Sequence, residues 1–272
     1  MESVIRPPDP KVLPDIGDLS PLLGAYEGIT LGEIRDSDAQ LQSRREKKFL
    51  MTFEQCVNLI SGLNGSYRAL DIEHSRIGRY DTMYYDTGSF MTYLQHHNGK
   101  ANRFKLRFRY YCSTGKTFLE VKERLNTGRT VKTRLETEGT ISLTDKGPAG
   151  FLESAFPYDF REFYPVLSTE YHRITLVSKD FGERVTFDLG LSFRNNTTLH
   201  SYPGVVVGEI KHDRPLFMSQ ALAGLKMMGI RKTRFSKYCI GVALLYPEQK
   251  HNAFKPVRTR LETLLHGGVT AC

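Results

Sequence analysis

The chain has no tryptophan, and its four cysteines (Cys56, Cys112, Cys239 and Cys272) are scattered widely over 272 residues. No two of them have the short spacing of a zinc-binding or redox motif, and a chain of this length does not need disulfides to fold. We therefore expect free thiols in a reducing compartment. The 14 tyrosines and 16 phenylalanines provide the large side chains for a sizeable core.

Long apolar runs are also missing. No run approaches the ~18 residues of a membrane-spanning helix. The first ten residues, MESVIRPPDP, are charged and rich in proline, whereas a signal peptide has an apolar centre. We expect a soluble, cytoplasmic protein; if it works at a membrane, a separate membrane-protein partner must take it there. The oligomeric state is left open.

The sequence contains no glycine-rich phosphate loop, neither a Walker pattern nor a dinucleotide-binding fingerprint. It also lacks the regular strand-helix alternation of a nucleotide-binding α/β fold. The formal charge of +8 nevertheless implies an anionic partner, which could be nucleic acid, a membrane surface or a phosphorylated small molecule. If this chain binds phosphate, it does so with side chains.

Positive charge is concentrated on one face of the expected strands. Successive side chains of a strand point to opposite faces, so Arg103, Lys105, Arg107 and Arg109 share one face and the intervening aromatic and aliphatic residues share the other. An ordinary half-buried strand also alternates in this way. Here the alternation recurs at residues 118–124, 131–135, 170–178, 183–193 and 205–211.

Like charges that face each other across strands destabilise a sheet. A polyanion lying among these cations would resolve the conflict. Guanidinium groups suit phosphate because they bind two of its oxygens at once. The aromatic residues of FKLRFRYY alternate away from the cations. An RNA-binding surface would instead interleave the two for base stacking, so no specific nucleic-acid partner is expected.

Turn and capping signals predict the order of elements. Residues 1–40 form a proline-rich leader without a long regular element, residues 41–247 form one domain, and residues 248–272 form a tail with a short helix. Thr52 and Gln55 predict a capping box for a helix that begins at Phe53. Other expectations are a helix near residues 90–96 capped by Thr87 or Ser89, a loop at 195–202, a helix opened by Pro215 and a last strand at 237–245.

Between Arg45 and Leu245 the chain resembles the catalytic domain of the vacuolar transporter chaperone (VTC) polyphosphate polymerases, a branch of the triphosphate tunnel metalloenzymes (CYTH-like). Nine matching segments occur in the family's order: EKKFL, YYDT, KLRFRYY, FLEVK, TVKTRL, YHRITL, RVTFDLGL, VVVGEIK and RFSKYCIG. The resemblance implies a mainly β (α+β) fold: a closed antiparallel barrel of eight strands with a charged bore and peripheral helices.

The resemblance also implies the site. It assigns phosphate binding and catalysis to Lys48, Arg107, Arg109, Lys122, Lys132, Arg173 and Lys237. It makes Glu209 the ligand of Mn²⁺ or Mg²⁺. By strand parity, supporting roles in the same bore fall to Glu120, Arg134, Asp188 and Lys211. His96 and His97 are expected to be ordinary helix-end or loop residues, because no third ligand accompanies them at a metal-binding spacing.

The implied function is a metal-dependent polyphosphate polymerase, whose substrates are ATP and inorganic polyphosphate. Hydrolases of the tunnel family begin their first strand with two alternating glutamates before the lysine. Here the corresponding face reads Arg44, Glu46 and Lys48, which favours the polymerase branch. Two alternatives stay open: a tunnel-type triphosphatase acting on inorganic or nucleoside triphosphates, and a non-catalytic module that binds polyphosphate or inositol phosphates.

Overall fold

A computed structural model of the chain describes residues 16, 19–34, 45–139, 141–212 and 219–266. Its centre is one sheet of twelve strands. The strands are β1 (Glu27–Ile29), β2 (Arg45–Thr52), β3 (Tyr67–Leu70), β4 (Gly78–Asp86), β5 (Arg103–Tyr111), β6 (Lys116–Arg124), β7 (Thr130–Thr137), β8 (Tyr164–Ser178), β9 (Glu183–Arg194), β10 (Leu199–Tyr202), β11 (Val205–His212) and β12 (Lys232–Thr233).

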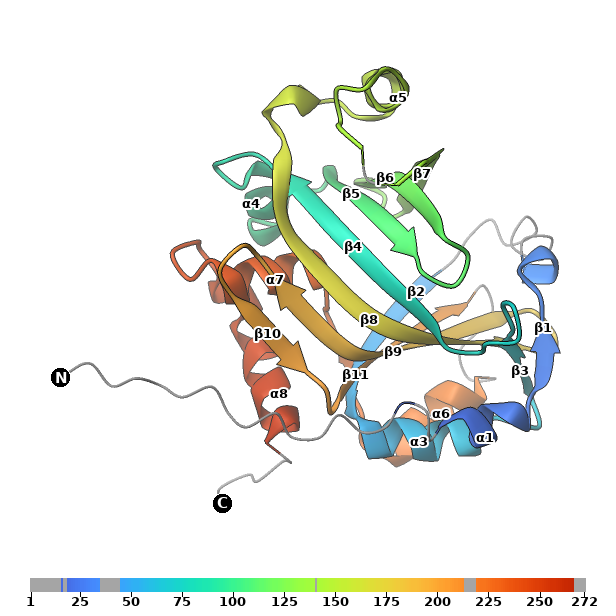
Figure 1. Ribbon diagram of the computed structural model, residues 1–272. Helices are drawn as coiled ribbons and strands as arrows, with labels where there is room; N and C mark the ends of the chain where they lie inside the picture. The colour runs from blue at the N-terminus through green and yellow to red at the C-terminus, as the bar shows by residue number, and fades with distance from the viewer. Residues whose placement is uncertain (1–15, 17–18, 35–44, 140, 213–218, 267–272) are drawn as a thin grey trace.

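The main path of the sheet runs β12-β2-β11-β9-β8-β4-β5-β6-β7, and every pair along it is antiparallel. β10 pairs with β9, β3 with β8, and the short β1 runs parallel to β3. The predicted meander at residues 102–137 corresponds to β5, β6 and β7. The sheet bends into a deep curve (Figure 1).

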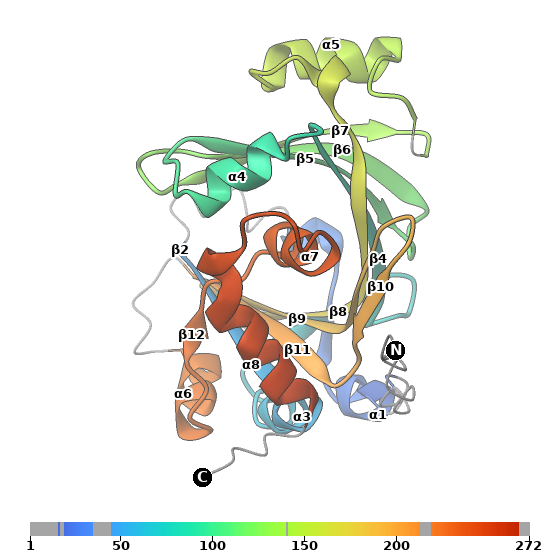
Figure 2. The same cartoon turned by 90° about the vertical axis from the view of Figure 1, so that its left-hand side faces the viewer.

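Helices cover both faces of this curve. They are α1 (Leu19–Gly24), α3 (Phe53–Ser61), α4 (Met91–His97), α5 (Lys146–Ala155), α6 (Gln220–Met227), α7 (Lys237–Leu245) and α8 (Lys255–Leu265), with short 3-10 turns η2 (Phe160–Glu162) and η4 (Asn252–Phe254). Figure 2 shows α7 lying inside the curve, while α1, α3 and α6 lie outside it. A mainly β, antiparallel architecture with peripheral helices is therefore confirmed.

Strand alternation explains the layers. Phe49, Met51 and Phe187 point outward and pack with α1, α3 and α6 in one core cluster. Leu106 and Phe108, also on the outward side, belong to a second cluster that includes residues of α5. The opposite side chains of the same strands face the concave side. The charged residues predicted to share a face therefore lie on the inner side of the sheet.

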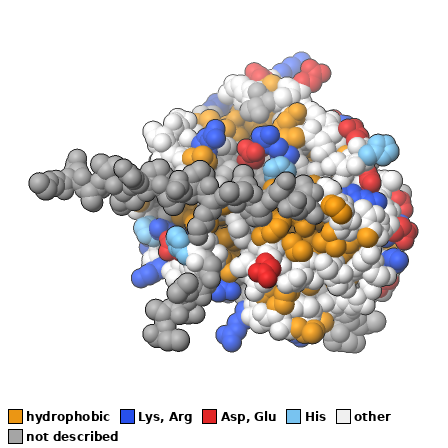
Figure 3. Space-filling model, turned by 60° about the horizontal axis from the view of Figure 1, so that its bottom comes forward, with side chains coloured by type: hydrophobic (Ala, Val, Ile, Leu, Met, Phe, Trp, Pro, Cys, Tyr) orange, Lys and Arg blue, Asp and Glu red, His pale blue; other side chains and the backbone are white. Residues whose placement is uncertain are grey.

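The outer face that carries α1, α3 and α6 does not account for the positive charge of the chain. In the part of this face that the described residues form, hydrophobic side chains gather near the middle, and lysine and arginine side chains are scattered (Figure 3). Among the described residues, no helix is long and apolar enough to cross a membrane.

The capping box predicted at Thr52 is present. Thr52 Oγ1 accepts a hydrogen bond from Gln55 N at 3.2 Å, and Gln55 Oε1 accepts one from Thr52 N at 3.0 Å. The N-cap position of helix α4 is Phe90, in a left-handed conformation, and not Thr87 or Ser89. The Thr87 side chain still contributes to the start of the helix, because its Oγ1 accepts a hydrogen bond from Met91 N at 3.1 Å. Residue 215 lies outside the described residues, and α6 begins after Ser219, which caps it.

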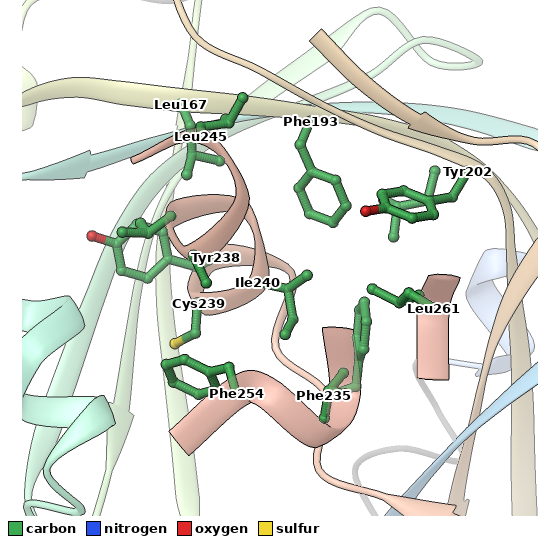
Figure 4. Close-up of a cluster of buried hydrophobic side chains, with 14 of the residues drawn as sticks. Leu167, Phe193, Tyr202, Phe235, Tyr238, Cys239, Ile240, Leu245, Phe254 and Leu261 are labelled. Atoms are coloured by element: carbon green, nitrogen blue, oxygen red, sulfur yellow. The ribbon is translucent and has the colours of Figure 1, made fainter. Parts of the chain in front are cut away.

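Residues 237–245 form helix α7 and not the predicted strand. A short, wholly apolar run fits a buried helix as well as a buried strand, because periodicity cannot separate the two. The helix is buried nearly all round, in the cluster shown in Figure 4. Gly241 allows its close approach to the sheet, since a Cβ there would lie 2.9 Å from Phe193 and 3.0 Å from Leu167. Residues 199–202 likewise form strand β10 where a loop was predicted.

The predicted closed barrel of eight strands is not confirmed. Among the described residues, β7 pairs only with β6 and β12 only with β2, so no ladder joins the two ends of the sheet. Strand parity shows which side chains share a face, but it carries no information on whether the first and last strands meet. The predicted leader does contribute to the fold, because Leu19, Leu23 and Tyr26 are buried in the outer core cluster.

Candidate active site

The concave face brings cations together in rows that cross the strands. Lys105 of β5 stands opposite Lys122 of β6, which stands opposite Lys132 of β7. In the next inward-facing row Arg107 stands opposite Glu120. Directly opposed side chains in an antiparallel pair have their Cβ atoms about 5 Å apart. Three strands therefore hold their charges within contact range.

Glu120 organises the first charged cluster. Its side chain is fully buried, and it accepts hydrogen bonds from Arg107 Nε at 2.8 Å, Arg107 Nη2 at 2.6 Å and Lys132 Nζ at 3.2 Å. Burial opposes ionisation, but the charges of Arg107, Arg109 and Lys132 outweigh it and lower the pKa of Glu120. Arg107 Nη1 also donates to the hydroxyl of Tyr84 at 3.2 Å. The Arg107 guanidinium is thus held in one orientation.

Asp188 organises a second cluster, where β8, β9 and α7 meet. It accepts hydrogen bonds from Arg173 Nε at 2.5 Å and Arg173 Nη2 at 2.8 Å, and a further one from Lys237 Nζ. Burial raises the pKa of Asp188, but Arg173 and Lys237 lower it further, to about 2. Lys237 Nζ lies 4.1 Å from the centre of the Tyr171 ring. Burial lowers the pKa of Lys237 to about 8, although Asp188 opposes this shift.

A third cluster on β2 and β11 alternates in charge. Lys48 Nζ lies 2.9 Å from Glu46 Oε1 and 3.5 Å from Glu209 Oε2, and Lys211 Nζ lies 2.7 Å from Glu209 Oε1. Although burial raises the pKa of Glu209, the charges of Lys211, Lys48 and others hold it well below its usual range. Glu209 is therefore an ionised carboxylate enclosed by cations.

Lys122 connects the first and third clusters. Burial, with a contribution from the charge of Lys48, lowers the pKa of Lys122 to about 7, and Glu46 and Glu209 partly oppose this shift. Lys122 belongs to β6, whereas these three residues belong to β2 and β11. The two ends of the curved sheet therefore face each other within electrostatic range. In the part of the chain that is described, Lys122 has no ion pair or hydrogen bond.

Lys105 and Ser236 are site residues that the sequence did not assign. Lys105 Nζ donates to Ser236 Oγ at 2.8 Å, and Lys48 Nζ donates to the carbonyl oxygen of Phe235 at 3.3 Å. Burial, together with nearby cations, lowers the pKa of Lys105 to about 8. Strand parity had placed Lys105 on the cationic face. Ser236 was missed because the residues after it are predicted as a strand. A serine directly before the first residue of a helix is an N-cap signal, but it applies only once 237–245 is known to be helical.

Two predicted residues lie toward the margin of these clusters. Arg109 is 7 % exposed, and its Nε donates to Thr82 Oγ1 at 3.2 Å. Arg134 is exposed on the outermost strand, with its guanidinium 4.6 Å from the centre of the Phe118 ring. The structure therefore brings together ten of the twelve predicted residues closely, with Arg109 beside them and Arg134 farthest out. The supporting role of Arg134 stays a prediction.

A buried carboxylate outside the site fixes α7 in the curve. Asp86, the acidic residue of YYDT, is wholly buried and accepts hydrogen bonds from Thr92 N, Thr92 Oγ1 and Tyr93 N at 2.8–3.0 Å. It also accepts one from the hydroxyl of Tyr238 on α7. One side chain at the end of β4 thereby anchors α4 and α7 together. The N-terminal ends of α4 and α7 are thereby fixed to β4, which pairs with β5, the strand that carries Arg107.

The histidines considered in the sequence have local partners. His96 Nδ1 lies 3.0 Å from Cys239 Sγ, and His97 Nε2 lies 2.7 Å from Asn252 Oδ1. Burial and the charge of Lys105 lower the pKa of His96 to about 2, so it is neutral near pH 7. Nothing in these contacts resembles a metal site.

The carboxylates fit a divalent cation that is shared with a substrate. Among the described residues, no three His, Cys, Asp or Glu side chains are arranged to hold a metal on their own. Glu46 and Glu209 lie on either side of the Lys48 ammonium. Mg²⁺ commonly uses one or two carboxylates, several waters and the phosphates of its substrate. The donor set at Glu209 fits this kind of binding.

Solved structures with a similar course of the chain are distant. A candidate adenylyl cyclase from Hippeastrum, described as having a dominant triphosphatase activity, is 15% identical with a TM-score of 0.47, covering 74% of this chain and 96% of that one. A candidate adenylate cyclase from Vibrio parahaemolyticus is 11% identical with a TM-score of 0.44, covering 72% of this chain and 95% of that one. The PH1012 protein from Pyrococcus horikoshii is 17% identical with a TM-score of 0.42, covering 72% of this chain and 99% of that one. Scores this low carry no argument about function.

Comparison with curated proteins finds no match. The model of the VTC domain family, in contrast, matches residues 43–246. The matched range contains every residue of the three charged clusters on the concave face. The chain belongs to the VTC domain family.

Proposed function

We propose that this protein is a polyphosphate polymerase, which transfers the terminal phosphoryl group of ATP to a growing chain of inorganic polyphosphate. The observation that carries the proposal is the excess of cations on the concave face. Four carboxylates (Glu46, Glu120, Asp188 and Glu209) are surrounded by Lys48, Lys105, Arg107, Arg109, Lys122, Lys132, Arg173, Lys211 and Lys237. Such an excess weakens a sheet unless an anion binds there.

Two kinds of cation divide the binding task. Arg107 and Arg173 are each fixed by a buried carboxylate, so their remaining N–H groups are oriented before a ligand arrives. Pre-oriented guanidinium groups bind phosphate oxygens in pairs with little loss of freedom. Lys122, in contrast, has no ion pair within the described residues. Its pKa is lowered to about 7, and a phosphate group bound beside it would stabilise its charged form.

Glu209 would bind Mg²⁺ or Mn²⁺, and Glu46 would be a second carboxylate near the cation. When bound there, the cation would neutralise charge on the phosphate oxygens of the nucleotide. The neighbouring lysines, Lys48 and Lys211, keep both carboxylates ionised and hold them on the concave face. Metal and triphosphate are therefore expected to bind cooperatively.

The protein's contribution to the chemistry is positioning and electrostatic stabilisation. Phosphoryl transfer proceeds by in-line displacement with charge spread over the equatorial oxygens of the transferred group. Fixed cations on several strands can contact those oxygens without rearranging during the reaction. The acceptor at the end of a phosphate chain is already ionised, so elongation does not require a general base.

The alternatives differ in what receives the phosphoryl group. In a triphosphatase, water would replace the phosphate chain, and in a non-catalytic module there would be no transfer. The single glutamate before Lys48 supports the polymerase, because tunnel hydrolases use two there. The substrates expected from this proposal are ATP and inorganic polyphosphate.

The deciding experiment is product analysis with ATP and Mn²⁺. We expect phosphate chains that run as a ladder on a polyacrylamide gel and are degraded by an exopolyphosphatase, with ADP as the nucleotide product. Release of orthophosphate without chains would identify a triphosphatase. Binding of tripolyphosphate without any turnover would identify the non-catalytic module. Either of these results would overturn the proposal.

A matched pair of variants tests the metal position. Glu209→Gln removes a charge and a metal ligand while retaining the shape of the side chain. We expect it to abolish turnover that depends on the divalent cation and to leave much of the phosphate binding intact. Glu153→Gln, on the exposed side of α5, is the control and should behave like the parent. Equal Mn²⁺-dependent rates for Glu209→Gln and the parent would refute the assignment of Glu209.

A further inference from the structure

Ser236 combines a nucleophilic hydroxyl with a basic amine inside the cationic site. It lies at the N-cap of α7 and is partly accessible. Its Oγ accepts hydrogen bonds from Lys105 Nζ at 2.8 Å and from the backbone N–H of Cys239 at 3.3 Å. The protonated Lys105 amine donates to Oγ across this contact, whereas the neutral amine can accept the hydroxyl proton of Ser236 across the same 2.8 Å. Serine and lysine in direct contact form a nucleophile and its base.

Lys105 is suited to accept a proton. Burial lowers its pKa to about 8; Cys239 opposes this shift, and the charges of Lys48, Arg103 and Arg107 add to it. A substantial fraction of this amine is neutral near pH 8, whereas an ordinary lysine is protonated there. General bases work best with a pKa near the working pH.

The residues around Ser236 belong to the predicted phosphate site. Lys48 donates to the carbonyl oxygen of Phe235, the preceding residue, at 3.3 Å. Lys237, the following residue, binds Asp188. Lys122 faces Lys105 across β5 and β6. A triphosphate bound by Lys48, Lys122 and Lys237 would therefore surround the Ser236 hydroxyl.

The N-cap position also favours the product of a transfer to Ser236. A phosphate group at the N-terminus of a helix is stabilised by the backbone N–H groups and by the positive end of the helix dipole. Lys105 and Lys48 would add charge-assisted hydrogen bonds. Phosphorylation here would strengthen the start of α7, whereas it would weaken the end of a helix.

We propose that Ser236 Oγ is an internal phosphoryl acceptor that primes chain synthesis. This inference takes its donor, ATP with a divalent cation, from the proposed function. Oγ forms a bond to the γ-phosphorus, the bond from that phosphorus to the β–γ bridging oxygen breaks with its electron pair leaving on ADP, and the hydroxyl proton passes to Lys105 Nζ. The ionised oxygens of the resulting phosphoserine then serve as the first acceptor for elongation.

The test is peptide mass spectrometry of the full chain after incubation with ATP and Mn²⁺ at pH 8, with chain products measured in the same reaction. We expect one or more phosphates on the peptide that contains Ser236. The modification should be absent in Ser236→Asn, which lacks the hydroxyl but still caps the helix. It should slow by about a hundredfold or more in Lys105→Gln, which loses the base. Ser219→Ala, at the cap of α6 outside the site, should be modified like the parent.

Priming has a second signature that loss of a helix cap would not produce. Chain synthesis by Ser236→Asn should show a lag, and added inorganic pyrophosphate should abolish it by providing a free acceptor. Chains formed without a lag by protein that is unmodified at Ser236 would overturn the inference and leave the polymerase intact. A phosphorylated Ser236 with orthophosphate as the only other product would overturn the polymerase and retain the acceptor. The absence of both chains and modification would reject both proposals.

Discussion

Replacing Asp188 with asparagine tests whether its carboxylate is needed to balance the buried cations. Asp188 is 2 % exposed and accepts hydrogen bonds from Arg173, at 2.5 and 2.8 Å, and from Lys237. Removing one partner of a buried ion pair costs about 3–5 kcal/mol, because the remaining charge is left unpaired. Asparagine keeps the shape and one acceptor, so we expect a loss of about 3 kcal/mol in the free energy of unfolding.

For a chain of this length, that loss corresponds to a fall in melting temperature of roughly 6–12 °C. Thermal unfolding of the ligand-free protein measures it directly. Asp159→Asn is the matched control, because Asp159 pairs with Arg161 at 3.3 Å on the exposed surface. Exposed pairs contribute about 0–1 kcal/mol. Inorganic tripolyphosphate should stabilise Asp188→Asn more than the parent, because the anion replaces the missing charge.

The difference in stability between the parent and Asp188→Asn should depend on pH, because the pKa of Asp188 is lowered to about 2 in the folded protein. A carboxylate with a depressed folded pKa stabilises the protein above its unfolded pKa of about 4. This stabilisation is lost as the pH falls from about 4 to 2. The difference between parent and variant should therefore shrink in that window. A variant that melts within a degree of the parent at pH 7 would refute the charge-balance argument.

Three further predictions concern the unpaired cations and the shape of the site. Lys122→Gln should raise the melting temperature of the ligand-free protein, because it removes a cation repelled by Lys48, and should reduce the stabilisation by tripolyphosphate; a lower melting temperature with an unchanged ligand response would contradict this. The pKa values of Lys122, Lys105 and Lys237 are lowered to about 7, 8 and 8 in the folded protein. Above pH 7 the unfolded chain therefore binds more protons than the folded one, so the free energy of unfolding of the ligand-free protein should rise toward pH 10. The affinity for tripolyphosphate, measured by calorimetry, should fall over the same range, because the three amines lose their charge. Duplex DNA, about 20 Å wide, should not displace tripolyphosphate from a concave face that also holds α7, and its weak binding should vanish with added salt; competition equal to that of polyphosphate would place the cations on an open surface.

The sequence predicted which charged residues share the concave face, but it did not predict whether the sheet closes around them. Lys105, Arg107 and Lys122 lie on one face because strand parity is a local property, and the register of β5 and β6 follows from the short turn between them. The capping box at Thr52 was predictable for the same reason. Each of these features depends on residues close together in the chain.

The failures depend on distant contacts. The run CIGVALL forms a helix that packs in the same core cluster as Leu167, Phe193 and Tyr202, which belong to three other strands. Nothing within the run itself distinguishes a buried helix from a buried strand. Once residues 237–245 were interpreted as a strand, Ser236 could not be recognised as a cap or as a partner of Lys105. Whether the sheet closes likewise depends on where β7 and β12 end relative to each other.

Three consecutive residues at the start of α7 hold three different parts of the site. The carbonyl of Phe235 contacts Lys48 of β2, the hydroxyl of Ser236 contacts Lys105 of β5, and the ammonium of Lys237 contacts Asp188 of β9. The alignment of these strands is therefore set by the seating of one nine-residue helix. A methyl group added at Gly241 would lie too close to Phe193 and Leu167, and any displacement of α7 that relieves this overlap would disturb all three contacts. The positions of three cations on the concave face therefore depend partly on the fit of the apolar side chains around α7.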